Sequence, residues 1–161
     1  MPTKLKPWHD DIVLPVLLGA ARKTYGAAIH RALAGVGCDD VPRLGARVLG
    51  ALARDSSVTD IAELCGISKQ AASQLVDTLV TRDYLTRTSD EHDRRRVNLR
   101  LTARGQEAAA VIAHAVLDVD AAITDRVGAQ ALADARLVVA NLVELGHPAH
   151  FGPGETPHVH E

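Results

Sequence analysis

The chain has 161 residues, enough for one domain or for a small domain within a helical scaffold, and 47% of them are hydrophobic. Only 2% are aromatic, and Ala, Leu and Val supply most of the apolar content, which favours a mainly α-helical protein. The net charge of −2 excludes a uniformly basic nucleic-acid binder but allows a local basic face. Cys38 and Cys65 are too few for a disulfide framework and resemble no metal-site spacing, so a reduced, cytoplasmic setting is expected.

The N-terminal segment, with Lys4 and Lys6 before the apolar run IVLPVLLGAA, superficially resembles a secretory signal. Asp10 and Asp11 interrupt that pattern, and the apolar run continues directly into ARKTYGAAIHRAL, which is helical in pattern. We therefore expect no cleaved signal. No apolar run approaches the roughly 20 residues that a membrane span needs.

Apolar residues recur at three- and four-residue steps from residue 11 to residue 36, which predicts a long helix with a broad buried face. Pro15 has no backbone donor, so the regular helix is expected to begin near it or to bend there. A second helix is expected to open at Asp40-Val41-Pro42, with Pro42 in its first turn, and to close at Arg54-Asp55-Ser56. Its expected core positions are Leu44, Val48, Leu49 and Leu52.

The segment 57–81 predicts two short helices joined by a tight turn. Ser57 is the expected N-cap of the first helix, with Asp60 completing an imperfect capping box. Gly66 is expected to end that helix, Ile67 to be buried in the turn, and Ser68 to cap the second helix. Two helices with so short a joint must cross steeply, which is the geometry of a helix-turn-helix.

The second of these helices has two distinct faces. Its expected inward positions are Ala72, Leu75, Val76, Leu79 and Val80. Its outward positions at the leading end are Lys69, Gln70, Ser73, Gln74 and Asp77. These outward side chains are small or hydrogen-bonding and can reach base edges in a major groove. An ordinary solvated helix face has the same pattern, so this face alone does not separate the two interpretations.

A two-stranded ribbon is predicted next, with strands at 84–88 and 96–101. In the second strand, Val97, Leu99 and Leu101 alternate with Arg96, Asn98 and Arg100. From Arg82 to Arg104 the chain carries seven arginines and four acidic residues, a local charge of +3. Arginines at the tip of such a ribbon, here SDEHDRRR, can enter a narrow minor groove or bind phosphate. We therefore favour DNA contact over a merely solvated loop.

Thr102 is expected to cap a helix that continues to about Val127, and a last helix is expected over about 129–145. Residues 147–161 are rich in Pro, Gly and His, which predicts a flexible tail. The predicted fold class is mainly α with a small β-wing, organised as a single domain over 1–161. Within it, a winged helix-turn-helix at 43–102 is flanked by long helices at 10–36 and 103–146.

With these elements in this order, the chain resembles the MarR family of bacterial transcriptional regulators over about residues 10–146. The motifs that carry the resemblance are SVTDIAELCGISKQAASQLVDTLVTRDYL and DRRRVNLRLTARG, with Asp93-Arg94-Arg95 and Leu101-Thr102-x-x-Gly105 at family spacing. The resemblance implies a homodimer in which the helices at 10–36 and 103–146 interleave as dimerisation helices. Their surplus of apolar surface agrees with this.

The resemblance further implies two recognition helices in successive major grooves of a pseudo-palindromic operator. In the wing, Asp93 would orient Arg95 through an ion pair, and Arg95 would enter the minor groove. The expected DNA contacts are Ser68, Lys69, Gln70, Ser73, Gln74, Asp93, Arg94, Arg95 and Arg96.

This chain departs from the family pattern in its recognition helix. Members often carry threonine or a similar residue at position 71 and arginines at 74 and 78, where this sequence has Ala71, Gln74 and Thr78. Losing two cationic phosphate contacts should weaken binding and reduce its salt dependence. Either the preferred operator differs, or affinity depends more on the wing arginines, while the helix N-terminus at Ser68 can still bind a phosphate.

The resemblance also implies that a small, often aromatic or phenolic, ligand binds between the dimer helices and the winged domain and releases DNA. Candidate pocket residues are the polar groups on otherwise apolar helices: Arg22, Tyr25, His30 and Arg47. For each one, a position on the surface or in the dimer interface is the alternative.

Sensing through a thiol or a metal is a further alternative. A redox switch needs an accessible thiolate near a cation, whereas Cys65 occupies an apolar stripe and Cys38 stands in an apparent loop beside Asp39 and Asp40. The tail histidines 147, 150, 158 and 160 could bind Zn or Ni adventitiously. Since no closed-site ligand spacing accompanies them, we expect no metal site and no cofactor.

The sequence thus predicts a cytoplasmic, sequence-specific DNA-binding transcriptional regulator, more often a repressor, that responds to a ligand. Its expected partners are double-stranded DNA, a second copy of the chain and a small-molecule effector, with no membrane. The alternatives are a winged-helix module that binds protein, and a metal- or redox-sensing variant of the same regulator. An enzyme is not expected, because the sequence has no glycine-rich phosphate loop, no nucleophile elbow and no cleft-forming pair of carboxylates.

Overall fold

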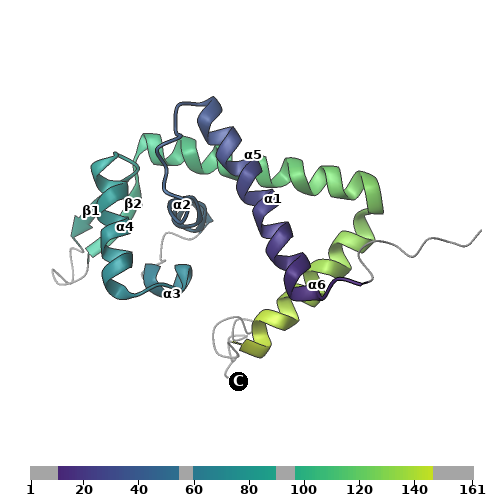
Figure 1. Cartoon of the computed structure of the whole chain (residues 1–161). Helices are drawn as coiled ribbons and strands as arrows, with labels where there is room; N and C mark the ends of the chain where they lie inside the picture. Colours follow the sequence, from purple (N-terminus) through teal and green to yellow (C-terminus); the bar gives the residue numbers. More distant parts are fainter. Residues whose placement is uncertain (1–10, 55–59, 90–96, 147–161) are drawn as a thin grey trace, which may run out of the picture. The chain divides into compact units, whose positions relative to one another are not determined.

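The computed structural model describes residues 11–54, 60–89 and 97–146 (Figure 1). The elements are, in order, α1 (Leu14–Gly35), α2 (Gly45–Arg54), α3 (Ile61–Cys65), α4 (Lys69–Thr81), β1 (Leu85–Ser89), β2 (Val97–Leu101), α5 (Ala103–Val127) and α6 (Ala129–Gly146). This confirms the prediction of a mainly α protein with one small sheet. The chain divides into two compact units, Met1–Val119 and Asp120–Glu161, and α5 contributes to both.

The boundaries of α1 follow from its sequence. It begins beside Pro15, whose missing backbone donor costs nothing in the first turn of a helix. It ends where Gly37 adopts a φ of +72° and the Cys38 N–H donates to the Leu33 carbonyl at 2.9 Å. Among the described residues, no helix is both long and apolar enough to cross a membrane.

The second helix begins later than the sequence suggested. Its regular part opens at Gly45 and not at Pro42, because residues 42–44 form a turn that leads into the helix. In that turn the Pro42 carbonyl accepts from Ala46 N–H at 3.2 Å, and the Leu44 carbonyl accepts from Arg47 N–H at 3.1 Å. Gly45 is buried there, and an added Cβ would lie 3.0 Å from Leu79 Cδ2 and 3.1 Å from Pro42 Cδ.

The core of the first unit is formed by residues of the winged helix-turn-helix. Its largest fully buried side chains are Tyr84, Leu49, Leu79, Leu85 and Val48. The helix α2 contacts α3, α4 and β2, and α4 contacts α3 and β1. Leu33 of α1 and Ile112 of α5 belong to the same core, so both long helices are anchored on it. Burying each large side chain of this kind stabilises the fold by about 1.5–3 kcal/mol.

The two strands form an antiparallel ribbon in which Leu85 pairs with Leu101 and Arg87 pairs with Leu99. Leu99 and Leu101 pack against the core while Arg100 is exposed, as the alternating pattern predicted. Arg96, the other outward arginine of that prediction, lies outside the described residues.

The second unit contains the end of α5 and the helix α6, joined at Gly128, which has a φ of +86°. Arg136 of α6 forms an ion pair with Asp120 of α5. None of the described side chains from Asp120 to Leu145 is buried. The large apolar side chains exposed on α6 are Leu137, Val138, Val139, Leu142, Val143 and Leu145.

Candidate functional site

The helix-turn-helix consists of α3, a turn at Gly66-Ile67-Ser68, and α4. The expectation that Ser57 caps α3 is wrong: the helix begins only at Ile61, and the Asp60 carboxylate accepts from Glu63 N–H at 2.9 Å. Ser57 itself lies outside the described residues. Gly66 has a φ of +65°, the left-handed conformation expected at this helix end.

The helix α4 presents its predicted polar face to solvent. Ser68 caps it, with its hydroxyl oxygen accepting from Ala71 N–H at 3.2 Å. The exposed residues include Ser68, Lys69, Gln70, Ser73, Gln74 and Asp77. On the opposite side Ala72, Val76 and Leu79 are buried, and these contacts hold the helix against the core. A steep crossing that exposes the leading end of α4 is the arrangement a recognition helix requires.

The positions that depart from the family pattern have specific environments. Ala71 is half-buried, and the Thr78 hydroxyl donates to the Gln74 carbonyl at 2.8 Å within the helix. Lys69 is thus the single cation among the exposed residues of α4.

The wing is described only through its two strands. The predicted contact residues Asp93, Arg94, Arg95 and Arg96 lie outside the described residues. On β1, Arg87 is exposed and its Nη2 lies 2.6 Å from the Asp77 carboxylate of α4. This ion pair joins the strand to the exposed face of α4 and reduces the negative charge there. Arg87 was not among the predicted DNA contacts, although it belongs to the same arginine-rich segment.

A cavity of about 680 Å³ lies between α1 and the segment that leads into α2, with Ile112 of α5 in its wall. All four predicted pocket residues line it: Arg22, Tyr25 and His30 from α1, and Arg47 from α2. The apolar wall includes Ile29, Leu33, Val41, Pro42 and Leu44.

The cavity is also lined by Lys23, Arg43 and Arg54, which the sequence analysis did not select. Lys23 and Arg54 are polar groups on α1 and α2, as the four predicted residues are, whereas Arg43 lies in the turn before α2. Among the described residues the lining includes five formal cations and no acidic group. Arg47 also donates from Nη1 to the Leu64 carbonyl at 3.3 Å, so one lining residue contacts the last turn of α3. In a chain of net charge −2, such a lining favours an organic anion.

Both cysteines are buried, Cys38 at 3% exposure and Cys65 at 8%. Burial raises the pKa of the Cys65 thiol, and the nearby Arg47 only partly opposes this effect. Cys38 was expected in an apparent loop; it follows the end of α1, but its side chain belongs to the core. Neither thiol has the exposure that a reactive cysteine needs. No group of three metal-ligating side chains occurs within the described ranges, and the histidine-rich tail lies beyond them.

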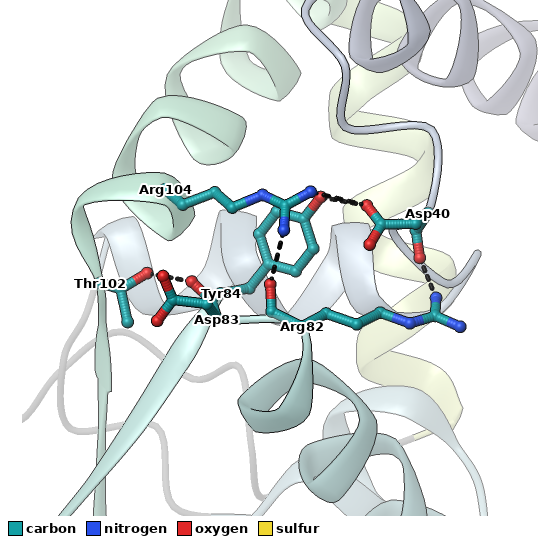
Figure 2. Close-up of polar contacts among 6 residues, drawn as sticks. All are labelled: Asp40, Arg82, Asp83, Tyr84, Thr102 and Arg104. Atoms are coloured by element: carbon teal, nitrogen blue, oxygen red, sulfur yellow. Dashed lines mark hydrogen bonds and ion pairs between the residues drawn. The ribbon is translucent and has the colours of Figure 1, made fainter.

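A polar cluster that the sequence analysis missed surrounds Asp40, in the segment between α1 and α2 (Figure 2). The buried Tyr84 donates its hydroxyl to the Asp40 carboxylate at 2.5 Å, and Arg104 Nη2 lies 3.1 Å from the same oxygen. Arg82 donates to the Asp40 backbone carbonyl. The guanidinium of Arg104 also lies over the Tyr84 ring, 4.4 Å from its centroid.

This cluster shifts the ionisation of its members. The hydrogen bond from Tyr84 is the main cause that lowers the pKa of Asp40; partial desolvation opposes it, and Arg104 and Arg82 reinforce it. Burial raises the pKa of the Tyr84 hydroxyl well above its usual range, and its hydrogen bond to Asp40 adds to the effect. At neutral pH, Asp40 is therefore a carboxylate and Tyr84 a neutral donor.

Comparison with known proteins agrees with this geometry. The sequence model of the MarR family matches residues 39–96. No curated protein sequence matches the chain. The transcriptional repressor CouR, solved bound to a 23-mer DNA duplex, is 24% identical with a TM-score of 0.64, covering 88% of this chain and 99% of that one.

Two other solved structures contain small ligands. NadR in complex with 4-hydroxyphenylacetate is 23% identical with a TM-score of 0.65, covering 88% of this chain and 97% of that one. A MarR family protein of Mycobacterium tuberculosis in complex with salicylic acid is 21% identical with a TM-score of 0.59, covering 83% and 98%. At these identities the similarity establishes the fold. Together, these comparisons show that residues 39–96 match the MarR family model and that the chain has the winged helix-turn-helix fold of the MarR-family structures.

Proposed function

We propose that the protein is a homodimeric, sequence-specific DNA-binding transcriptional regulator whose DNA affinity is lowered by a small organic anion. The observation that carries the proposal is the exposed polar leading end of α4, where Lys69, Gln70, Ser73 and Gln74 project from a helix held firmly at its back. Glutamine can bind adenine in a bidentate manner, and lysine can bind guanine or phosphate. The wing arginines Arg94, Arg95 and Arg96 are proposed to supply the phosphate or minor-groove contacts that α4 lacks.

The apolar surface of α6 supports a homodimer. Leu137, Leu142 and Leu145 are 64%, 42% and 82% exposed, and so many large apolar side chains on one helix are rarely left in water. A two-fold symmetric pair would bury the face against its own copy and present two α4 helices to a pseudo-palindromic operator.

The cavity supports a ligand with an apolar body and a negative group. Ile29, Leu33 and Leu44 offer apolar contacts, and Arg22, Arg43 and Arg47 offer donors to a carboxylate. The aromatic acids bound by the related structures, 4-hydroxyphenylacetate and salicylic acid, have this chemistry. A ligand that binds the DNA-incompetent arrangement more tightly would release the operator, which is the behaviour of a ligand-responsive repressor.

The DNA-binding part of the proposal is tested by fluorescence anisotropy with duplex DNA from the promoter beside the protein's own coding sequence, over a range of salt concentrations. We expect Arg94→Ala/Arg95→Ala to lower affinity at least about tenfold and to reduce the salt slope by about 2. Gln70→Ala should instead relax discrimination at one base position by about 1–3 kcal/mol. Arg31→Ala, which removes an exposed arginine of α1, is the matched control and should leave binding unchanged.

If the wild-type protein fails to bind any duplex at low salt, the DNA-binding proposal is wrong. Intact binding by the double wing variant would instead favour the winged-helix protein-interaction alternative for this surface.

A further inference from the structure

The Asp40 cluster lies between the two sites that the proposed function requires. Asp40 immediately precedes Val41, Pro42 and Arg43, and all three line the cavity, whereas Asp40 does not. The residues that bind Asp40 lie at the junction of α4 and β1: Arg82 is the C-terminal cap of α4, and Tyr84 directly precedes β1. Figure 2 shows the carboxylate and the backbone carbonyl of Asp40 bound by these residues. Asp40 thus connects Val41, in the cavity wall, to the end of α4.

The far side of this connection behaves as one rigid piece. Asp83, between Arg82 and Tyr84, has a φ of +59°, and its carbonyl accepts from the Thr102 hydroxyl at 2.5 Å. Arg104 donates to the Arg82 carbonyl at 2.9 Å. Gly105 packs so closely that an added Cβ would lie 2.0 Å from the Tyr84 carbonyl oxygen. Hydrogen bonds and close backbone packing thus link the end of α4, the start of β1 and the first turn of α5.

Apolar packing also connects the cavity wall to α4. Gly45 packs tightly against both regions, because an added Cβ would lie 3.0 Å from Leu79 Cδ2 of α4 and 3.1 Å and 3.5 Å from Pro42 Cδ and Val41 Cγ1 of the cavity wall. Val41 is buried, and Leu79 is fully buried. Any displacement of the 41–43 segment by a bound molecule must therefore either compress α4 or pull on Asp40.

We propose, on the basis of the function proposed above, that Asp40 is the positioning residue that transmits occupancy of the cavity to the recognition helix. Its carboxylate is held by Tyr84 and Arg104 and its carbonyl by Arg82, so it fixes the 41–43 segment to the α4–β1 junction. A ligand that moves 41–43 moves the C-terminal end of α4 and the base of the wing with it. In the absence of ligand, the same contacts keep α4 in the arrangement that binds DNA.

The test compares Asp40→Asn with Asp39→Asn, a change of the same size and charge at the adjacent, exposed residue. Asparagine keeps the shape of Asp40 but removes the charge that Arg104 and Tyr84 bind. DNA affinity is measured by anisotropy with and without saturating 4-hydroxyphenylacetate or salicylate, and the ratio of the two dissociation constants is the coupling. We expect the ratio for Asp40→Asn to be reduced at least threefold from a wild-type value in the usual 5- to 150-fold range, and unchanged for Asp39→Asn.

Calorimetry of the probes without DNA separates transmission from binding. Because Asp40 does not line the cavity, its substitution should change the dissociation constant of the probe by no more than about twofold. Only the effect of the bound probe on DNA affinity should decrease. Tyr84→Phe, which removes one hydroxyl and keeps the buried ring, should reduce the ratio in the same direction. A coupling ratio in Asp40→Asn equal to that of the wild type would overturn the proposal.

A readout that needs neither probe nor DNA keeps this proposal distinguishable from the proposed function. Hydrogen exchange in Asp40→Asn should accelerate together at residues 41–46 and 79–84, and should not accelerate in Asp39→Asn. If the wild type ignores both probes while exchange rises in both segments, the link exists and the proposed ligand class is wrong. If exchange changes in neither segment, Asp40 does not connect them.

Discussion

The two units of the chain are stabilised in different ways. In Met1–Val119 the helix-turn-helix, the ribbon and parts of both long helices share one core, in which Leu49, Leu79 and Tyr84 are fully buried. In Asp120–Glu161 none of the described side chains up to Leu145 is buried, and six leucines and valines of α6 are exposed. The first unit contains the contacts that fold it. The second exposes apolar side chains on α6, which the proposed homodimer would cover.

The largest expected effect comes from substitutions on α6. We expect Leu137→Glu/Leu142→Glu to dissociate the proposed dimer, because burying carboxylates in an apolar interface costs several kcal/mol, here about 5 kcal/mol per dimer. Light scattering at micromolar concentration should show a mass near that of one chain, while hydrogen exchange around Leu79 keeps its protection. Glu144→Gln on the same helix should stay dimeric. A wild type that is already monomeric at this concentration would refute the assembly.

A smaller but more local effect is expected at Gly105. Alanine there would place its Cβ 2.0 Å from the Tyr84 carbonyl oxygen, a backbone atom that cannot rotate away. We expect Gly105→Ala to lower the free energy of unfolding by about 3 kcal/mol, measured as a shift of the urea midpoint. Gly50→Ala, whose Cβ would make only an ordinary contact of 3.8 Å with Ile112, should be neutral or slightly stabilising. Equal effects of the two substitutions would show that the close packing at Gly105 is not a constraint.

Removing one hydrogen bond should lower the free energy of unfolding more in the first unit than in the second. Asp60→Ala removes the N-cap of α3 and should cost about 1 kcal/mol, while Asp60→Asn retains an acceptor and most of the stability. In the second unit, Gln130→Ala removes an exposed hydrogen bond of 2.8 Å to Asp134 and should cost no more than about 0.5 kcal/mol. Denaturant unfolding of the three variants measures both costs, and a larger loss for Gln130→Ala would reverse the comparison.

A comparably small effect is the expected pH dependence of stability at Asp40. Its contacts lower the pKa of the folded state below the unfolded value of about 3.9, so its stabilisation is present above that value and is lost as pH falls through the folded pKa. Because the side chain is 39% exposed, the contribution is at most about 1 kcal/mol. The difference in unfolding free energy between wild type and Asp40→Asn should therefore shrink between about pH 5 and pH 2. A difference that stays constant over this range would show that Asp40 gains nothing from its charge.

Much of the fold could be predicted from the sequence because the signals are local. Gly66 and Ser68 mark the turn, the spacing of Ala72, Val76 and Leu79 gives the inward face of α4, and the alternation of Leu99 and Arg100 gives a strand. The errors are also local: Asp60 replaced Ser57 as the cap, and Pro42 led into a turn before its helix. In both cases several polar or turn-forming residues stand within a few positions of one another, and the local pattern does not decide which of them caps the helix or forms the turn.

The candidate sites were harder to predict because they depend on contacts distant in sequence. Asp40 meets Tyr84 and Arg104 across 44 and 64 residues, and nothing about Asp40 marks it within its own segment. The four polar residues chosen as pocket candidates do line one cavity, but Lys23, Arg43 and Arg54 line it as well. Polar residues near an apolar stripe are recognisable in a sequence, while the shape that brings them together is not.

The cationic lining of the cavity has a consequence for the rate at which an anion would bind. Charges of one sign around a concave surface draw an oppositely charged molecule from solution, and the rate of encounter falls as salt shortens the screening length to about 8 Å. Equilibrium occupancy is governed as much by apolar walls such as Ile29 and Leu33, which salt affects little. For the proposed anionic ligand, higher ionic strength should therefore slow association by a larger factor than an uncharged analogue would show.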